Sequence, residues 1–328
     1  NVTFDYSEIR PAGSFLNSSG GKAPGPEPLK NALVNIKKIL DKALKNLEFC
    51  HGEGRRLEPI EAYDIVMYSA DAVISGGVRR SATICLFSPN DEEMAKAKTG
   101  SWFVENPQRG RSNNSAILLR EKTTKKQFSK LMQSVKEFGE PGFVWADSTE
   151  LIVNPCVEIG MWPVDEETGE SGWQACNLST INCAKIKTEE DFLNACKAAS
   201  IIGTLQAGFS SFPYLGKVSE NIVKREALLG VSMTGIMEQY EICLDPKIQK
   251  DGAKVVKDEN KRIAKIIGIN QAARTTCIKP EGTSSCVLGT SSGIHPHHAK
   301  RYIRRVQANK LEPIYNYFRE VNPRACEE

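Results

Sequence analysis

The chain has 328 residues, of which 40% are hydrophobic and 25% are charged, and its formal net charge is +3. This composition is typical of a folded soluble protein, and so small a net charge does not indicate a nucleic-acid or membrane partner. No run in the sequence approaches the roughly 18 to 20 apolar residues that a membrane span requires.

The cysteines and the two ends of the chain add to this first picture. Ten cysteines without a Cys-x-x-Cys pair favour a cytoplasmic protein with reduced thiols over a disulfide scaffold or a zinc ribbon, and we expect no metal site. The chain starts at Asn1 without an initiator Met. We therefore expect native segments before Asn1 and after Glu328.

The first half of the chain alternates helical and strand patterns after a long loop rich in Pro, Gly and Ser. Apolar residues at helical spacing predict helices, and short runs of apolar and β-branched residues predict strands. In chain order we expect the loop at 11–28, helices at 29–50 and 58–74, strands at 83–87 and 112–120, a helix at 125–139 and a strand at 142–148.

The second half continues this alternation. Thr188, followed by acidic residues, is a helix N-cap signal. We expect an exposed hairpin or loop at 165–174, a strand at 176–186, helices at 188–209 and within 219–268, a loop at 277–298 and a closing helix at 300–321. Strands that alternate with helices predict the α/β class, as a closed barrel or a wound sheet.

One short segment, Asn154-Pro155-Cys156-Val157-Glu158, carries three chemically active groups. In an extended chain residues i, i+2 and i+4 point the same way, so the amide, the thiol and the carboxylate would share one face. Pro155 fixes its own φ and removes a backbone donor. Such a row favours chemistry over packing, although a cysteine alone also suits a small buried hydrophobic position.

Three further segments need an explanation together with this motif. In "KPEGTSS", residues 279–285, backbone N–H groups and hydroxyls could cradle a phosphate. The loops at 10–28 and 75–82 are rich in glycine, and the second carries Arg79 and Arg80. Each segment is a weak signal alone, because plain turns have the same composition.

In the order in which they occur, these segments resemble the catalytic subunit of ribonucleotide reductases. The likeness covers nearly the whole chain: "IRPAGS", "GGKAPGPEPL", "SGGVRRSA", "NPCVEIG", "ACNLSTINC", "KPEGTSS" and "SSGIHP". The sequences of these motifs are most similar to those of class II, the adenosylcobalamin-dependent branch. The resemblance implies a ten-stranded α/β barrel with a central finger loop, formed by a single catalytic domain over 1–328.

The resemblance also implies a role for each group of the thiol motif. Cys156 would become the thiyl radical that takes the 3′-hydrogen of the substrate ribose, with adenosylcobalamin as the cofactor that supplies the radical. Glu158 would accept the 3′-hydroxyl proton as general base, and Asn154 would hydrogen-bond the ribose hydroxyls. The substrate would be a ribonucleoside di- or triphosphate.

Cys176 matches the position of one of two thiols that supply electrons and end as a disulfide. The family places the partner thiol on a strand before "IRPAGS", which this sequence lacks. Cys85 follows the "GGVRRSA" loop instead, so we interpret it as a buried strand residue. A thioredoxin-like protein or a dithiol would reduce the disulfide again.

The remaining assignments follow from the same resemblance. The substrate phosphates would bind Glu281, Gly282, Thr283, Ser284 and Ser285. A deoxynucleotide effector would act through two loops that contain Arg10, Gly13, Ser14, Gly20, Gly21, Gly76, Gly77, Arg79 and Arg80. The sequence leaves open whether the chain works as a monomer or a homodimer.

Two alternatives remain open. The first is the large subunit of a class I reductase, whose radical comes from a separate metal-containing subunit. It predicts a tyrosine pair near the C-terminus, and "YNYF" at 315–318 does not lie in that context. The second is a nucleotide sensor without turnover, which the missing partner thiol favours. A glycyl-radical reductase is disfavoured because no R-V-x-G-Y-type segment occurs.

Overall fold

The structure is a computed structural model and describes residues 3–17, 22–45, 56–73, 81–303, 305, 308, 310 and 313–326. The chain divides into two compact units, one of residues 1–147 with 304–328 and the other of residues 148–303. A single catalytic domain over 1–328 stays a prediction. The α/β class is confirmed, because both units combine helices with strands.

The first unit is built on a parallel three-stranded sheet in the order β1-β2-β3. Its strands are β1 (Thr83–Phe87), β2 (Ser112–Leu119) and β3 (Gly142–Ala146). Its helices are α1 (Glu27–Lys45), α2 (Pro59–Val73), α3 (Glu92–Ala95), α4 (Trp102–Glu105), α5 (Lys125–Phe138) and α11 (Pro313–Val321). The sequence predicted all three strands and helices α1, α2 and α5, but not the short α3 and α4.

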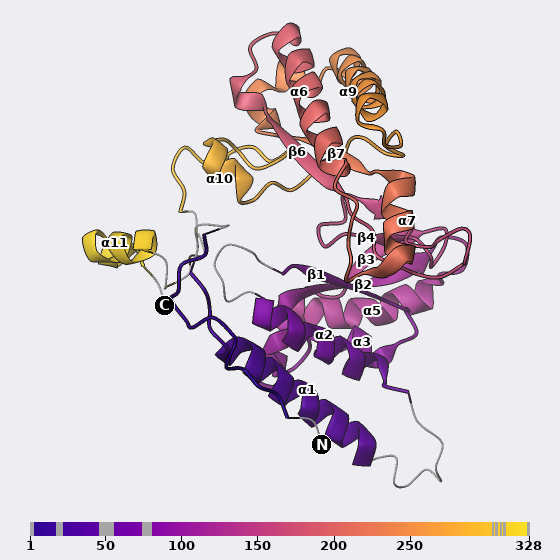
Figure 1. The fold of residues 1–328 in the computed structure, drawn as a ribbon, viewed down its shortest axis with the longest axis vertical. Coiled ribbons are helices and arrows are strands. Elements are labelled where there is room, and N and C mark those ends of the chain that lie inside the picture. The colour runs from indigo at the N-terminus through magenta and orange to yellow at the C-terminus, as the bar shows by residue number, and fades with distance from the viewer. Residues whose placement is uncertain are drawn as a thin grey trace. The chain divides into compact units, whose positions relative to one another are not determined.

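Helices α2, α3 and α5 cover one face of this sheet (Figure 1). Tyr63 and Met67 of α2, Phe87 of β1, Leu118 of β2 and Leu131 of α5 are buried there in one hydrophobic core. Helix α5 connects β2 to β3, as parallel strands require a crossover connection.

Helix ends lie where the capping residues predict them. The Thr124 side chain accepts a hydrogen bond from the Gln127 N–H at the start of α5, and Gly139 ends this helix at a φ of +77°. The predicted N-cap Thr188 likewise accepts from the Asp191 N–H. These signals are local, so the sequence alone identifies them.

The second unit holds two small sheets and a layer of helices. Its strands are β4 (Ile152–Val153), β5 (Gly160–Met161), β6 (Asn177–Asn182) and β7 (Leu229–Thr234). Its helices are α6 (Glu189–Ala207), α7 (Gly216–Glu226), α8 (Tyr240–Cys243), α9 (Pro246–Ile267) and α10 (Ser284–Leu288). Strands β6 and β7 are parallel, and α6 packs against both strands and against α9 (Figure 1).

Backbone hydrogen bonds add the segment 274–277 along the other side of β7. The Leu229 N–H donates to the Arg274 carbonyl at 3.0 Å, and the Cys277 N–H donates to the Val231 carbonyl at 3.1 Å. Val231 and Thr276 form an isolated parallel bridge. Segment 274–277 therefore runs beside β7 and leads directly into the "KPEGTSS" segment.

Three predictions for the second half are wrong in detail. The mixed helical pattern at 219–268 contains strand β7, whose residues are nearly all buried, so that even its polar residues do not mark a solvent-facing side. The loop at 277–298 contains the short helix α10. Residues 300–303 are not helical. The last described helix begins at Pro313, and proline is favoured in the first turn of a helix.

The hairpin or loop expected at 165–174 is a hairpin, whose paired residues lie within 163–172. The Asp165 N–H donates to the Glu170 carbonyl at 2.9 Å, and Val164 bridges Ser171 in antiparallel fashion. The strand predicted at 176–186 is β6, which ends at Asn182 and continues as a 3-10 turn over Cys183–Lys185.

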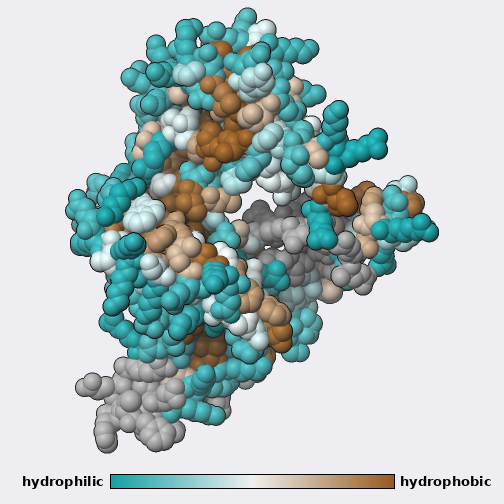
Figure 2. All heavy atoms as spheres, turned by 180° about the vertical axis from the view of Figure 1, so that it is seen from behind, coloured by the Kyte–Doolittle hydropathy of each residue, from teal (hydrophilic) through white to brown (hydrophobic). Residues whose placement is uncertain are grey.

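Hydrophilic side chains predominate on the face in Figure 2, with hydrophobic side chains in separate patches between them. No helix among the described residues is long and apolar enough to cross a bilayer.

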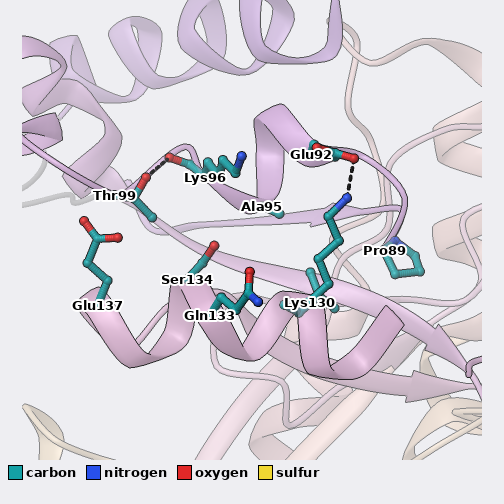
Figure 3. Close-up of a pocket in the computed structure, with 10 residues that line it drawn as sticks. Pro89, Glu92, Ala95, Lys96, Thr99, Lys130, Gln133, Ser134 and Glu137 are labelled. Carbon is teal, nitrogen blue, oxygen red and sulfur yellow. Dashed lines mark hydrogen bonds and ion pairs between the residues drawn. The ribbon is translucent and has the colours of Figure 1, made fainter. Parts of the chain in front are cut away.

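A surface pocket of about 260 Å³ lies between α3 and α5 of the first unit. Figure 3 shows Glu92 and Lys130 pointing toward one another across it, where they form an ion pair. The lining mixes acidic with basic side chains and includes none of the residues that the sequence motifs single out. This pocket is therefore not the candidate site.

Candidate active site

The thiol motif forms the tight connection between β4 and β5. These strands pair antiparallel, with Val153 opposite Gly160. Between them Asn154 closes the connection twice: its N–H donates to the Ile159 carbonyl at 3.3 Å, and its side-chain Oδ1 accepts from the Ile159 N–H at 3.0 Å. The Asn154 amide oxygen is thus used by the turn itself.

The expected extended row of Asn154, Cys156 and Glu158 is wrong. The Val157 N–H donates to the Asn154 carbonyl at 2.8 Å, which makes these residues a β-turn. Pro155 explains this, since proline is favoured at the second turn position and asparagine at the first. Val157 takes a φ of +65°, a left-handed conformation that is costly for a β-branched residue.

The turn gives the thiol and the carboxylate opposite environments. Cys156 lies at the third turn position and is exposed. The Glu158 side chain is only 2% exposed, and its Oε1 lies 3.3 Å from Nζ of Lys279. No described residue hydrogen-bonds the other oxygen, Oε2, although this atom is buried too. A buried carboxylate oxygen without a partner is costly and is a ready acceptor for a ligand hydroxyl.

Cys176 lies immediately before β6 and packs against the base of the turn. It joins Leu178, Ile159 and Met161 in a small hydrophobic cluster around Leu228. Burial raises the pKa of the Cys176 thiol to about 12. The thiol is therefore protonated at neutral pH, as a group that donates hydrogen and electrons would need to be.

This pKa predicts the pH dependence of Cys176 alkylation. Because only the thiolate reacts, labelling by iodoacetamide should be slow at pH 8 and rise about tenfold per pH unit up to roughly pH 11. The exposed Cys156 should be labelled first. Mass spectrometry of digested protein measures both rates, and equal labelling of the two thiols at pH 8 would contradict the buried environment of Cys176.

Gly230 on β7 permits the close approach of the turn to the sheet. A Cβ atom at this position would lie 2.4 Å from Leu178 Cδ2, 3.0 Å from Cys277 Sγ and 3.2 Å from Ile159 Cδ1. Only glycine fits under these side chains without displacing them. The close packing of the turn on the sheet therefore depends on Gly230.

We expect Gly230→Ala to lower the free energy of unfolding by about 1–3 kcal/mol, the usual cost of overpacking. Urea denaturation measures this loss. Gly160→Ala is the matched control, because its added Cβ would meet nothing closer than 3.8 Å. Equal stability of both variants would refute the close packing of the turn on β7.

The predicted phosphate-binding residues lie in and before α10. Glu281 is buried and takes a φ of +54°, and its carboxylate accepts a hydrogen bond from the Ser284 hydroxyl. No described residue accepts from the N–H groups of Gly282, Thr283 and Ser284. Ser285 is buried and donates its hydroxyl to the Gly282 carbonyl at 3.2 Å.

These features bring the thiol motif and the phosphate segment together in the second unit. Lys279 provides the contact, since its backbone begins "KPEGTSS" and its side chain reaches Glu158. Lys279 has no role in the sequence prediction, because nothing local in the sequence indicates a partner 121 residues away.

The predicted effector residues belong to the first unit, where three of them are described. The Gly13 N–H donates to the Ala23 carbonyl, and the Ala23 N–H donates to the Ser14 carbonyl, each at 2.8 Å. Arg10 is exposed beside this loop. The other predicted effector residues lie outside the described residues: Gly20, Gly21, Gly76, Gly77, Arg79 and Arg80.

In fold, the chain is similar to the catalytic subunits of ribonucleotide reductases. It superposes on a crystal structure of a B12-dependent (class II) ribonucleotide reductase with a TM-score of 0.65, covering 88% of this chain and 43% of that chain at 24% identity. At this identity the match concerns the fold alone.

In sequence, the chain is similar to two adenosylcobalamin-dependent reductases. It is 29% identical over 344 residues to a probable adenosylcobalamin-dependent ribonucleoside-triphosphate reductase of Dictyostelium discoideum, covering 98% of this chain and 43% of that protein. It is 25% identical over 358 residues to the adenosylcobalamin-dependent ribonucleoside-triphosphate reductase of Lactobacillus delbrueckii subsp. bulgaricus, covering 95% of this chain and 45% of that protein. No protein-family model matches the chain.

These comparisons confirm the resemblance to class II ribonucleotide reductase catalytic subunits. The chain spans less than half the length of the curated relatives it matches.

Proposed function

We propose that this protein reduces ribonucleoside triphosphates to 2′-deoxyribonucleoside triphosphates by thiyl-radical chemistry. One observation carries the proposal: the exposed Cys156 thiol and the buried Glu158 carboxylate lie in one turn, and the carboxylate keeps one oxygen without a partner among the described residues. The names of the relatives support the triphosphate as substrate and class II over class I.

Each residue of the site would carry out its own step of the reaction. The Cys156 thiyl radical takes the 3′-hydrogen of the ribose while Glu158 Oε2 accepts the 3′-hydroxyl proton. The 2′-hydroxyl leaves as water. Cys176 and a partner thiol supply two electrons and two protons, one proton for the water and one for the 2′ carbon, and become a disulfide. Cys156 then returns the hydrogen to the 3′ carbon, and Glu158 returns its proton to the 3′ oxygen.

Asn154 has a narrower role in this scheme than its motif suggests. Its Oδ1 already holds the Ile159 N–H, so the side-chain NH₂ group would donate to a ribose hydroxyl. One amide group then fixes both the turn and the sugar, which holds the ribose at a set distance from Cys156.

The phosphates would bind the backbone N–H groups of Gly282, Thr283 and Ser284, with the Thr283 hydroxyl beside them. Three adjacent N–H groups without acceptors among the described residues support this placement. Glu281 would shape the segment through Ser284 rather than touch the phosphate, since two anionic groups repel. Ser285 would hold the Gly282 carbonyl.

Adenosylcobalamin would supply the radical, because its cobalt–carbon bond breaks homolytically. Cys156 is exposed, so its sulfur is accessible to such a radical source. We assign no residue of the chain to the corrin. The reaction would take place in the cytoplasm, where thiols stay reduced.

The wider assembly belongs to the same proposal. The strands described here would form part of a ten-stranded α/β barrel, with the turn 154–159 as its central finger loop, in one catalytic domain of a longer protein. The fold likeness supports this arrangement. A deoxynucleotide effector would act through the loops around Arg10, Gly13 and Ser14 and around 75–82, and a dithiol or thioredoxin-like protein would restore Cys176, in a monomer or a homodimer.

The test is a product assay on the full-length protein. With a ribonucleoside triphosphate, a dithiol and adenosylcobalamin, we expect deoxyribonucleoside triphosphate without any added subunit. Product that appears only with a metal-containing radical subunit would select class I instead. Nucleotide binding without product under either condition would identify a sensor and overturn the proposal.

A further inference from the structure

Among the described residues, Lys279 makes the one polar contact to the Glu158 carboxylate, and its backbone is fixed from two sides. Its N–H donates to the hydroxyl of the fully buried Ser232 on β7 at 2.9 Å. From the other side, Gly293 lies so close that an added Cβ would be 2.7 Å from the Lys279 carbonyl oxygen. The Ser292 hydroxyl donates to the next carbonyl, that of Pro280, at 2.5 Å.

A fixed backbone matters because it holds the start of the Lys279 side chain at a set place beside Glu158, although the side chain itself still loses rotamer entropy on forming the ion pair. The Lys279 side chain is 25% exposed and the Glu158 side chain 2%. The pair is thus much less screened than the ion pairs on the surface of the same unit, such as that of Lys247. A carboxylate buried this deeply remains charged only with a partner such as a nearby positive charge.

The groups around the pair set its electrostatics. Those that face it come from four segments: Cys156 of the turn, Cys176 before β6, Cys277 beside β7, and Glu281 of the phosphate segment. Arg274 contributes a second positive charge on the Cys176 side. Burial lowers the pKa of Lys279, but the charge and hydrogen bond of Glu158, together with the nearby Cys156 and Glu281, outweigh burial, so the pKa is raised and Lys279 stays charged.

We propose that Lys279 is a positioning residue for the proposed reaction: its ammonium group holds the Glu158 carboxylate ionised, with Oε1 occupied and Oε2 left to accept the ribose 3′-hydroxyl proton. This inference rests on the proposed function. It adds a residue whose effect is to set the protonation state and orientation of the base without itself touching the reacting atoms.

The sign of the effect follows from the charges. An ammonium group beside a buried carboxylate favours the charged form, so the carboxylate stays available as a base at lower pH. Without the ammonium group, the buried acid keeps its proton to higher pH. We therefore expect the acid limb of the kcat/KM profile to move upward by about 1–3 pH units in Lys279→Gln.

Three variants of the full-length protein test the inference. Lys279→Gln should show the shifted limb, with kcat falling more than substrate affinity at pH 7. Lys279→Arg should restore most of the original profile, because it returns the charge. Lys247→Gln, which removes an exposed lysine of an ion pair in the same unit, should change neither profile nor affinity.

A second readout does not depend on turnover. The infrared carboxyl band of Glu158, assigned by its loss in Glu158→Gln, should report the protonated acid at higher pH in Lys279→Gln than in the unsubstituted protein. If the protein makes no deoxyribonucleotide but this band shifts, the proposed function fails and the role of Lys279 stands. If neither the pH profile nor the band moves in folded Lys279→Gln, the inference is wrong.

Discussion

Cys156→Ser is expected to abolish deoxyribonucleotide formation, by roughly 10⁴-fold or more, while nucleotide binding stays unchanged. An S–H bond is weak enough to give up and regain a hydrogen atom, whereas the O–H bond of serine is much stronger. The side chain is exposed at a turn, so the substitution removes no core packing. Product assays and equilibrium binding of the triphosphate measure the two effects separately.

Cys326→Ser controls for the loss of a thiol as such, since Cys326 lies in the other unit. If Cys156→Ser still forms product at a comparable rate, the assignment of the radical site is wrong. Loss of binding together with activity would instead point to a damaged fold, which a thermal melt would reveal.

The second large effect is expected for Glu158→Gln. The amide keeps the size of the side chain and can still accept a hydrogen bond from Lys279, but it cannot take up a proton as a carboxylate does. We expect kcat to fall about 10²–10⁴-fold, the usual contribution of a general base. Steady-state kinetics at several pH values provide the measurement.

Glu220→Gln is the matched control, because Glu220 pairs with Lys217 and Lys224 on the surface of the same unit. It should leave the kinetics unchanged. A Glu158→Gln variant with near-normal kcat would show that this buried carboxylate does not act as the base.

The sequence could predict those parts of the fold that depend on neighbouring residues. Thr188 caps α6 and Gly139 ends α5 because each acts within one helical turn. Strand β7 was missed for the opposite reason. A strand buried on both faces has no solvent-facing side, so its short pattern of polar and apolar residues was not distinguished from part of a helix.

The candidate site shows the same difference between features set by neighbouring residues and features set by tertiary structure. The residue types of Asn154, Cys156 and Glu158 indicated chemistry, but their extended geometry was wrong because the turn preference of Pro155 outweighs strand alternation. The ion pair to Lys279 could not be predicted at all, since it depends on how 274–279 lies beside β7. Sequence therefore identified the groups, and tertiary structure determines their arrangement.

The most direct test of the central claim is freeze-quench electron paramagnetic resonance of the full-length protein mixed with adenosylcobalamin and a ribonucleoside triphosphate. We predict a radical signal whose line shape changes when the cysteines carry deuterium at Cβ, and which is absent from Cys156→Ser but present in Cys326→Ser. A signal that is insensitive to labelled cysteine, or that persists in Cys156→Ser, would contradict a radical on the sulfur of Cys156.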